Sequence, residues 1–163
     1  MRNFTIRRAQ KKDLPSLGRL GARLVRMHHA FDHMRFKAPG NAIEEGYSWF
    51  LGEQMKESTV AVFVAEQDRS VAGYVYAALE PLNWKELRDP AGFIHDVVVD
   101  EPKRNGGMGA ALIEAASDWI REKGVPRVIL WTAEQNTGAQ RLFARLGFRR
   151  TMIEMTRELV EKP

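Results

Sequence analysis

The chain has 163 residues, a formal net charge of +4 at pH 7 and no cysteine. Hydrophobic residues make up 44% of it and charged residues 28%, a composition that is ordinary for a globular domain and argues against disorder. The absence of cysteine excludes disulfides, thiolate metal sites and a cysteine nucleophile. We expect residues 1–163 to form one domain.

Lysine and arginine are spread along the chain without a long basic block, so most of them are expected to solvate the surface. The positive surplus fits an anionic ligand, and we expect no nucleic-acid partner. No apolar run approaches the roughly 18 residues of a membrane-spanning helix, and residues 1–6 lack a signal-peptide core. These features predict a cytoplasmic protein without a membrane partner.

The first third of the chain predicts one strand and two helices. Residues 4–9 alternate between apolar and polar, as in a strand. A helix follows, with Asp13 as its cap and an apolar stripe that extends to His28. A Pro-Gly pair then breaks the chain, and a second helix is expected over residues 42–56.

The middle of the chain predicts strands. Residues 59–67 and 71–80 form a hairpin by length and composition. Residues 81–92 form a loop that is long enough to border a site. Residues 93–99 are rich in β-branched side chains and apolar on both faces, which is typical of a strand buried inside a sheet.

A glycine-rich turn, residues 100–109, follows this buried strand. Pro102 interrupts regular pairing, and helical spacing from Met108 predicts a helix that ends near Lys123. The first N–H groups of a helix lack partners within it and carry partial positive charge, so they bind anions. Arg104 adds a full positive charge beside them. The pattern predicts a phosphorylated ligand that carries a pyrophosphate.

Two common phosphate-binding motifs do not fit this turn. A P-loop needs Gly-Lys-Ser/Thr at the start of the helix, but Gly109 is followed by Ala110 and Ala111. A dinucleotide fingerprint that begins at Gly107 needs a third small residue where the chain has Leu112. The spacing therefore excludes both motifs.

The last third predicts a strand, a helix and a further strand. Residues 127–132 are apolar on both faces and should pair in parallel with the buried strand through a right-handed crossover. A helix over residues 137–146 should end at Gly147 with a left-handed cap. Residues 148–159 are then expected to return as a strand.

Two motifs carry a family resemblance. The first is Arg104-x-x-Gly107-x-Gly109, directly after the Val-rich strand. The second runs Asn136-x-x-Ala139-x-x-x-Phe143-x-x-x-Gly147-Phe148. With these motifs the chain resembles the GCN5-related N-acetyltransferases (GNAT). The resemblance implies an α/β fold with a mixed, mostly antiparallel sheet, splayed at a central parallel strand pair and flanked by about four helices. It also implies acetyl-CoA as cofactor.

The resemblance assigns cofactor contacts to three stretches of the chain. Backbone groups of the strand would bind pantetheine at Val97, Val98 and Val99. The turn and the first residues of the helix would bind the pyrophosphate, namely Arg104, Asn105, Gly106, Gly107, Met108, Gly109 and Ala110. Asn136 and the helix that carries Phe143 would close the other side.

Acetyl transfer to an amine requires a proton acceptor, stabilisation of the thioester oxygen and departure of a thiolate. His95 and Asp96 on the central strand are the catalytic candidates. Neighbouring strand residues point to opposite faces, so we expect them to do different jobs. Histidine, with an unperturbed pKa of about 6.5, suits a base, although a histidine on a buried strand is often only a hydrogen-bonded core residue. Asp96 is more readily interpreted as structural.

The proton donor that many family members use is missing. Where they carry a tyrosine one turn before the Gly-Phe pair, this chain has Phe143, which has no proton to give. A thiol with a pKa of about 8.5 leaves tolerably well as the anion, so water can complete the step.

The acceptor region is expected near residues 28–36, between the first two helices. Asp32 would hold an ammonium group, with Phe31 and Phe36 as apolar walls. Tyr76 and Glu80 are weaker candidates to line the same cleft.

The sequence favours an acetyl-CoA-dependent N-acetyltransferase that acts on a small primary amine by direct transfer in a ternary complex. The alternatives are a non-catalytic acyl-CoA sensor and a protein or peptide N-acetyltransferase. His29 and His33 are four residues apart but lack a carboxylate constellation, so no metal site is expected. A homodimer is expected by analogy with the family alone.

Overall fold

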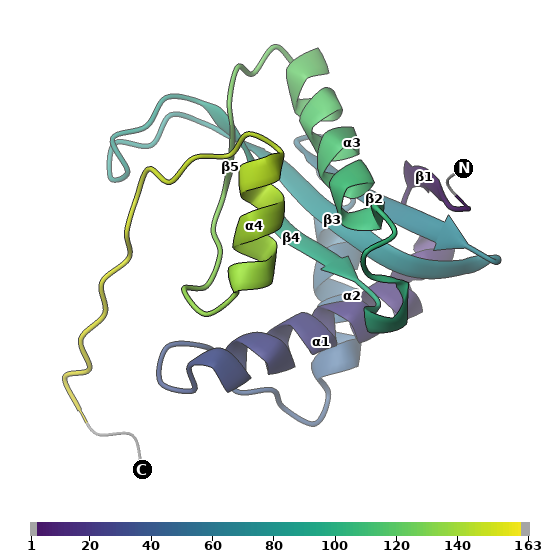
Figure 1. Cartoon of the computed structure of the whole chain (residues 1–163), viewed down its shortest axis with the longest axis horizontal. Helices are drawn as coiled ribbons and strands as arrows, with labels where there is room; N and C mark the ends of the chain where they lie inside the picture. The colour runs from purple at the N-terminus through teal and green to yellow at the C-terminus, as the bar shows by residue number, and fades with distance from the viewer. Residues whose placement is uncertain (1–2, 161–163) are drawn as a thin grey trace.

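The computed structural model describes residues 3–160, which form one five-stranded sheet with helices on both faces (Figure 1). The strands, in the spatial order β1-β2-β3-β4-β5, are Thr5–Arg8, Val60–Gln67, Ser70–Glu80, Ala91–Val99 and Val128–Leu130. The helices are α1 (Leu14–Phe31), α2 (Ile43–Gln54), α3 (Met108–Glu122) and α4 (Thr137–Arg145), with short 3₁₀ turns at Lys11–Asp13 (η1) and Glu101–Lys103 (η2). None of the helices within these described residues is long and apolar enough to cross a membrane.

Strands β1 to β4 pair antiparallel, and β4 and β5 pair in parallel. This mixed sheet with four α-helices among the described residues confirms the expected fold class. The domain prediction also includes residues 1–2 and 161–163, which lie outside the described part of the chain.

The two faces of the sheet carry separate cores. Helices α1 and α2 cover the face on which Tyr74 and Tyr76 lie, and Leu17, Leu20 and Leu51 are fully buried against it. Helix α3 covers the other face, where the side chains of its buried stripe pack with Phe143 of α4. The apolar spacing seen in the sequence therefore selects the buried side of each helix.

Two glycines allow α1 and α2 to approach closely. A Cβ at Gly18 would clash with the backbone of Glu44, and a Cβ at Gly21 would overlap the ring of Tyr47. Without these side chains, Tyr47 lies directly on α1, and its hydroxyl extends toward the sheet. The close packing of the helices thus positions a polar group beneath β4.

The parallel pair β4–β5 is short. Its register covers Gly92↔Val128, Phe93↔Ile129 and Ile94↔Leu130, whereas β4 continues to Val99. Residues 95–99 of β4 therefore have no strand partner on the β5 side. This is the splayed sheet that the family resemblance implies, and it leaves backbone N–H and C=O groups free for a ligand.

The expected strand over residues 148–159 is wrong. Gly147 ends α4 in the left-handed conformation, with φ +87, and the N–H of Phe148 donates to the carbonyl of Phe143 at 3.0 Å, as predicted for a glycine cap. The chain then runs past the end of α1, extended and exposed, without joining the sheet (Figure 1). An extended segment becomes a strand only where an adjacent sheet edge can pair with it.

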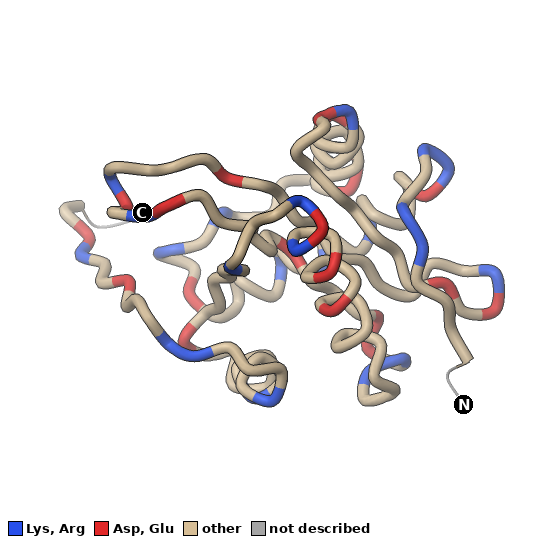
Figure 2. The backbone as a smooth tube through the Cα atoms, turned by 90° about the horizontal axis from the view of Figure 1, so that it is seen from above, with Lys and Arg blue, Asp and Glu red and all other residues tan. Residues whose placement is uncertain are grey.

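Charged residues are interspersed over the molecule (Figure 2). Blue and red segments alternate along most loops and helices, and no single face of the tube is uniformly basic. The positive surplus is therefore distributed, which agrees with the absence of a basic block in the sequence.

Candidate active site

The start of α3 forms an open cradle of backbone N–H groups. Gly107 precedes the helix with φ +80, no side chain caps the helix, and the first helical bond runs from the N–H of Ala111 to the carbonyl of Gly107. A Cβ at Gly107 would have no neighbour within 4 Å. Asn105 is also left-handed, at φ 68. The turn thus presents free N–H groups and partial positive charge to solvent, as an anion site requires.

Arginines from α1 fix the base of this turn. Arg19 donates two hydrogen bonds to the carboxylate of Asp100, each 3.1 Å long, and Arg23 pairs with the same carboxylate. Arg104 donates to the carbonyl of Val99 at 3.2 Å. The end of β4 is therefore bound on one side by α1 and on the other by the turn itself, so the strand and the cradle are held in a fixed relation.

A β-bulge at His95 changes the faces of β4. Tyr76 pairs with Asp96 and Ala77 with Ile94, so that His95 is the extra residue. Its ring contacts Tyr76, whereas Asp96 contacts Tyr74, and these two tyrosines share one face of β3. The prediction that His95 and Asp96 point to opposite faces is therefore wrong. One inserted residue shifts the alternation, which sequence spacing does not reveal.

The imidazole of His95 is held on three sides. Its ring lies 4.9 Å from that of Tyr76 and stacks with that of Phe93 at 5.7 Å, while its Nε2 lies 3.2 Å from Oε1 of Glu80. Because a carboxylate only accepts, Nε2 donates the proton in this bond. The neutral ring then keeps Nδ1 as its free acceptor. The structure thus pairs Glu80, a predicted substrate residue, with His95, where it orients the ring.

Asp96 is buried beneath the sheet between two tyrosines. The hydroxyl of Tyr74 donates to its Oδ2 at 2.8 Å, and that of Tyr47 donates to the same oxygen at 2.5 Å. Burial raises the pKa of Asp96, and these two hydrogen bonds and the charges of His95 and His28 oppose the rise. Burial, followed by the charge of Asp96, raises the pKa of both tyrosines. The pKa values of all three groups are therefore raised by the same buried surroundings.

The other strand tyrosine, Tyr76, faces the site. Burial, then the charges of Asp96 and Glu80, raises its pKa to about 12. Its hydroxyl donates to Oε1 of Gln54 at 2.8 Å. The sequence predicts Tyr76 as a substrate residue, and in the structure its ring packs against the imidazole of His95.

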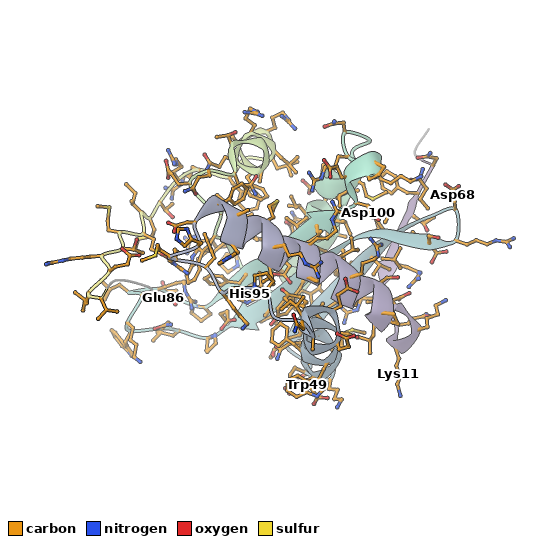
Figure 3. The ribbon with its side chains drawn as sticks, turned by 90° about the horizontal axis from the view of Figure 1, so that it is seen from below. Lys11, Trp49, Asp68, Glu86, His95 and Asp100 are labelled. Atoms are coloured by element: carbon orange, nitrogen blue, oxygen red, sulfur yellow. The ribbon has the colours of Figure 1, made fainter. Side chains whose placement is uncertain are left out.

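A pocket lies beside His95, at the open end of β3 and β4. It is lined by Glu80, Asn83, Glu86, Arg88, Phe93, Ile94, His95 and Trp131. Arg88 pairs with Glu86 at 2.8 Å and lies over the ring of Phe93 at 5.0 Å, which anchors the loop after β3. Figure 3 shows His95 near the centre of the molecule and Glu86 toward one end. The pocket therefore combines carboxylates with aromatic walls.

The predicted acceptor residues between α1 and α2 form a separate group around His28. The rings of Phe31 and Phe36 pack edge-on against His28 at 5.8 and 4.9 Å. Oδ1 of Asp32 accepts the backbone N–H groups of Met34 and Arg35 at 3.0 and 3.1 Å. Asp32 thus stabilises its own turn.

The second motif contributes structural contacts. The side chain of Asn136 caps α4 by accepting the N–H of Ala139 at 3.2 Å. Phe143 is buried, with its ring 6.0 Å from that of Phe148. A Cβ at Gly109 would meet Leu142 of α4 at 3.3 Å, so this glycine also lets α3 and α4 pack closely.

Several residues of the site were missed from the sequence. Tyr47 lies in the helix expected over residues 42–56, and the signal that could have identified it is that a buried tyrosine needs a polar partner. Tyr74 and Trp131 were assigned to strands without a role. Arg19 and Arg23 gave no signal, since exposed arginines on a helix are common. Within residues 3–160, no group of three or more histidine, aspartate or glutamate residues is arranged to hold a metal ion.

The unpaired half of β4 thus leads into the uncapped, glycine-lined start of α3. The model of the acetyltransferase (GNAT) family matches residues 25–148, which is more than half of the chain. The chain belongs to this family.

Individual relatives agree with this assignment. An uncharacterized N-acetyltransferase of Methanocaldococcus jannaschii is 29% identical over 148 residues, which cover 91% of this chain and 62% of that protein. An N-alpha-acetyltransferase of Sulfurisphaera tokodaii is 32% identical over 118 residues, covering 69% of this chain and 71% of that protein. The chain thus spans less than two thirds of the Methanocaldococcus protein.

Solved structures share the fold. The aminoglycoside N-acetyltransferase AAC(6')-Iy, crystallised with CoA, superimposes with a TM-score of 0.77 and 21% sequence identity. The match covers 96% of this chain and 95% of that one. At this identity the likeness establishes the arrangement of strands and helices.

Proposed function

We propose that the protein is an acetyl-CoA-dependent N-acetyltransferase that acetylates a small primary amine by direct transfer in a ternary complex. The observation that carries this proposal is the continuity of the unpaired half of β4 with the uncapped start of α3. An extended thioester carrier with a pyrophosphate at one end matches both parts of this groove. The family assignment supports the same chemistry.

The residues present fit coenzyme A. Backbone groups of Val97, Val98 and Val99 would pair with pantetheine along the open side of β4. The N–H groups at residues 106–110 and the guanidinium of Arg104 would hold the pyrophosphate, because they combine a helix start with full positive charge. Bound there, acetyl-CoA supplies the activated acetyl group.

His95 is the proposed base. Its Nε2 donates to Glu80, so Nδ1 is free to accept a proton from the ammonium form of the acceptor. The carboxylate of Glu80 stabilises the imidazolium that results, and the rings of Tyr76 and Phe93 keep the imidazole in one orientation. Asp96 acts from below by fixing the bulge through Tyr47 and Tyr74.

We assign stabilisation of the thioester oxygen to the backbone and protonation of the thiolate to solvent. The N–H groups of β4 that face its open side would stabilise the thioester oxygen as it becomes negative. Phe143 cannot donate a proton, so the thiolate leaves as the anion and takes its proton from water.

The pocket beside His95 supports a small amine as acceptor. Glu80 lines it with a carboxylate, the charge of Glu86 is paired with Arg88, and Phe93 and Trp131 give it aromatic walls, a combination suited to a cation with an apolar part. Its position beside His95 would bring an ammonium group near the proposed base.

Two observations favour other functions. Phe143 in place of a tyrosine is what a non-catalytic acyl-CoA sensor would tolerate. The likeness to an N-alpha-acetyltransferase favours a peptide acceptor. The proposal is distinguished from both by the products that the protein forms.

The test is a thiol-release screen in which acetyl-CoA is offered with polyamines, aminoglycosides, arylalkylamines and peptides. The chain has no cysteine, so a thiol reagent detects only free CoA. We expect release that depends on a small amine, together with the acetylated amine in the mass spectrum. Release of CoA with peptides alone would show that the acceptor is a peptide and not a small amine. Binding of acetyl-CoA without release of CoA would show that the protein is a sensor.

We further infer that residues 1–163 work as one domain in the cytoplasm, where acetyl-CoA is available, without a nucleic-acid partner. Fractionation of cells that express the tagged protein checks the location. Retention in the membrane fraction after a salt wash would contradict it.

A further inference from the structure

Most polar groups of the pocket beside His95 are bonded to the protein itself. Arg88 pairs with Glu86 at 2.8 Å and also donates to two backbone carbonyls of the same loop, at 3.1 and 3.0 Å. Oδ1 of Asn83 accepts two backbone N–H groups at 3.0 and 3.3 Å. Glu80 binds the imidazole of His95 at 3.2 Å. The charged groups of the pocket therefore hold its own loop and its own histidine.

The largest exposed surface in the pocket is the indole of Trp131, a residue that is 71% exposed. The indole packs edge-on against the ring of Phe93, with centroids 6.1 Å apart. Phe93 is only 6% exposed, because the guanidinium of Arg88 lies over its ring at 5.0 Å and the imidazole of His95 stacks on it at 5.7 Å. Phe93 thus supports the indole from below, and the indole is left for a ligand.

Trp131 lies across the sheet opening from the proposed base. Ile94 and Leu130 form the last pair of the parallel ladder between β4 and β5. His95 and Trp131 are the next residues in the chain, so they are the first on either side of the opening, and both line the pocket. Paired strands lie about 5 Å apart. A molecule whose amine reaches His95 therefore has its neighbouring atoms beside the indole.

We propose that the acceptor is a primary amine joined by a short linker to an aromatic ring, and that Trp131 is the residue that selects it. This inference rests on the N-acetyltransferase function proposed above and narrows its substrate class. The aromatic ring would lie on the indole while the amine meets the imidazole of His95. The exposed part of Glu80 would face the ammonium form of the amine before it loses its proton.

The bonding of the pocket favours this class over more polar amines. A flat aromatic ring buries area against an indole without needing hydrogen-bond partners. An aminoglycoside or a polyamine carries hydroxyl or further ammonium groups into the same space. Polar groups that lose water without gaining partners weaken binding. Because Arg88 and Glu86 already pair with each other, they offer such ligands little compensation.

A comparison of acceptors tests the substrate class, with release of CoA measured at saturating acetyl-CoA. We expect kcat/KM for 2-phenylethylamine to exceed the values for spermidine, kanamycin and ethylamine by at least about 10-fold, because the aromatic amine covers the indole. Spermidine or kanamycin acetylated as efficiently as 2-phenylethylamine would overturn the inference while leaving the enzyme an N-acetyltransferase.

Trp131→Ala tests the residue. It should lower kcat/KM for 2-phenylethylamine at least about 10-fold more than for ethylamine, mainly through KM of the aromatic amine. Trp131→Phe keeps a ring and should retain most of the preference. The matched control is Trp49→Ala, which removes a tryptophan of α2 that is 69% exposed and should leave the preference unchanged. Equal losses for both amines in Trp131→Ala would contradict a selective role.

A binding measurement separates this inference from the catalytic function. Saturation-transfer NMR detects 2-phenylethylamine on the full-length protein in the presence of CoA, without turnover. We expect transfer to its aromatic protons in the wild type and a clear loss of that transfer in Trp131→Ala. Absence of binding to the wild type would overturn the aromatic site. Binding that depends on Trp131, together with no CoA release from any amine, would overturn the catalytic function and support the aromatic site.

Discussion

The two sides of the sheet are built differently. On the side of β1, β2 and β3, the strands pair along their lengths with one register shift, between Ala65 and Glu66, and Arg7 ties β1 to its surroundings by donating to Asp13 at 2.8 and 2.9 Å and to Glu66 at 2.8 Å. On the side of β4 and β5, a bulge interrupts the ladder between β3 and β4, and the parallel pairing covers three residue pairs. The first side, here called the continuous side, is paired throughout, whereas the second, here called the interrupted side, leaves residues 95–99 of β4 without a strand partner toward β5.

The same contrast separates two buried carboxylates. Asp13 is 5% exposed and Asp96 8%. The guanidinium of Arg7 lowers the pKa of Asp13 despite its burial. Burial raises the pKa of Asp96, whose neighbours are neutral tyrosine hydroxyls. Asp13 has a cationic partner and Asp96 has hydroxyl donors, so the pKa values of the two buried carboxylates shift in opposite directions.

The largest expected effect is on the interrupted side, at the helix start. Gly107→Glu places a carboxylate against the pyrophosphate and strains a backbone that has φ +80. We expect CoA affinity to fall at least about 100-fold, which corresponds to about 2.7 kcal/mol. Isothermal titration calorimetry with CoA measures it.

Gly107→Ala is the control, because it carries the strain without the charge. It should lose much less affinity than the glutamate variant. Unchanged CoA binding in Gly107→Glu would contradict the pyrophosphate site.

The next effect is at the bulge. His95→Ala removes the proposed base and should lower kcat on the best amine by about 100-fold, with KM for acetyl-CoA little changed. Glu80→Gln, which keeps a hydrogen-bonding group near Nε2 but removes the negative charge, should lower kcat less. Steady-state kinetics provide the comparison. Wild-type turnover in His95→Ala would reassign this histidine to packing.

On the continuous side, the expected effect is on stability. Arg7→Ala leaves Asp13 buried without its cation and should cost about 1–3 kcal/mol of unfolding free energy, discounted because Arg7 itself is partly exposed. Urea denaturation measures the loss, and kcat should stay near the wild-type value. Arg121→Ala removes an exposed pair with Asp118 and should cost at most about 0.5 kcal/mol. Equal losses in the two variants would refute the role of the pair.

The smallest effect is a difference in pH dependence between the two carboxylates. Because the folded pKa of Asp96 lies above its ordinary value of 3.8, its contribution to stability is present below that pH and lost as pH rises through the folded pKa. Asp96→Asn removes this loss, so its Tm relative to the wild type should rise between about pH 3 and pH 7.

Asp13→Asn should show the opposite trend. The pKa of Asp13 is lowered from 3.8, so its contribution is present above that pH and lost as pH falls through the folded pKa. Its Tm relative to the wild type should fall as pH rises toward about 5 and should then stay level. Calorimetry measures the Tm of both variants. The same dependence of Tm on pH in the two variants would contradict the opposite pKa shifts of the two carboxylates.

Features set by local sequence were predictable. Gly147 adopts the positive φ expected of a helix cap, and the strand over residues 93–99 lies inside the sheet. These outcomes depend on backbone freedom and on hydrophobic spacing, which neighbouring residues largely determine.

Features set by long-range contacts were not predictable. The bulge at His95 depends on the register between β3 and β4, and the partners of Asp96 come from α2 and β3, 49 and 22 residues away in the chain. Residues 148–159 are expected as a strand, but strand formation depends on which sheet edge lies within reach. The pocket beside His95 combines a loop, two strands and Trp131, so no short pattern encodes it.

The lack of a side chain at Gly21 affects the hydrogen bonding of Asp96 from a distance. A methyl group on α1 would push the ring of Tyr47 outward and so withdraw one of the two protons offered to Asp96. The pKa of Asp96 is thereby adjustable through the spacing of two helices, without replacing any residue of the proposed cofactor and acceptor sites.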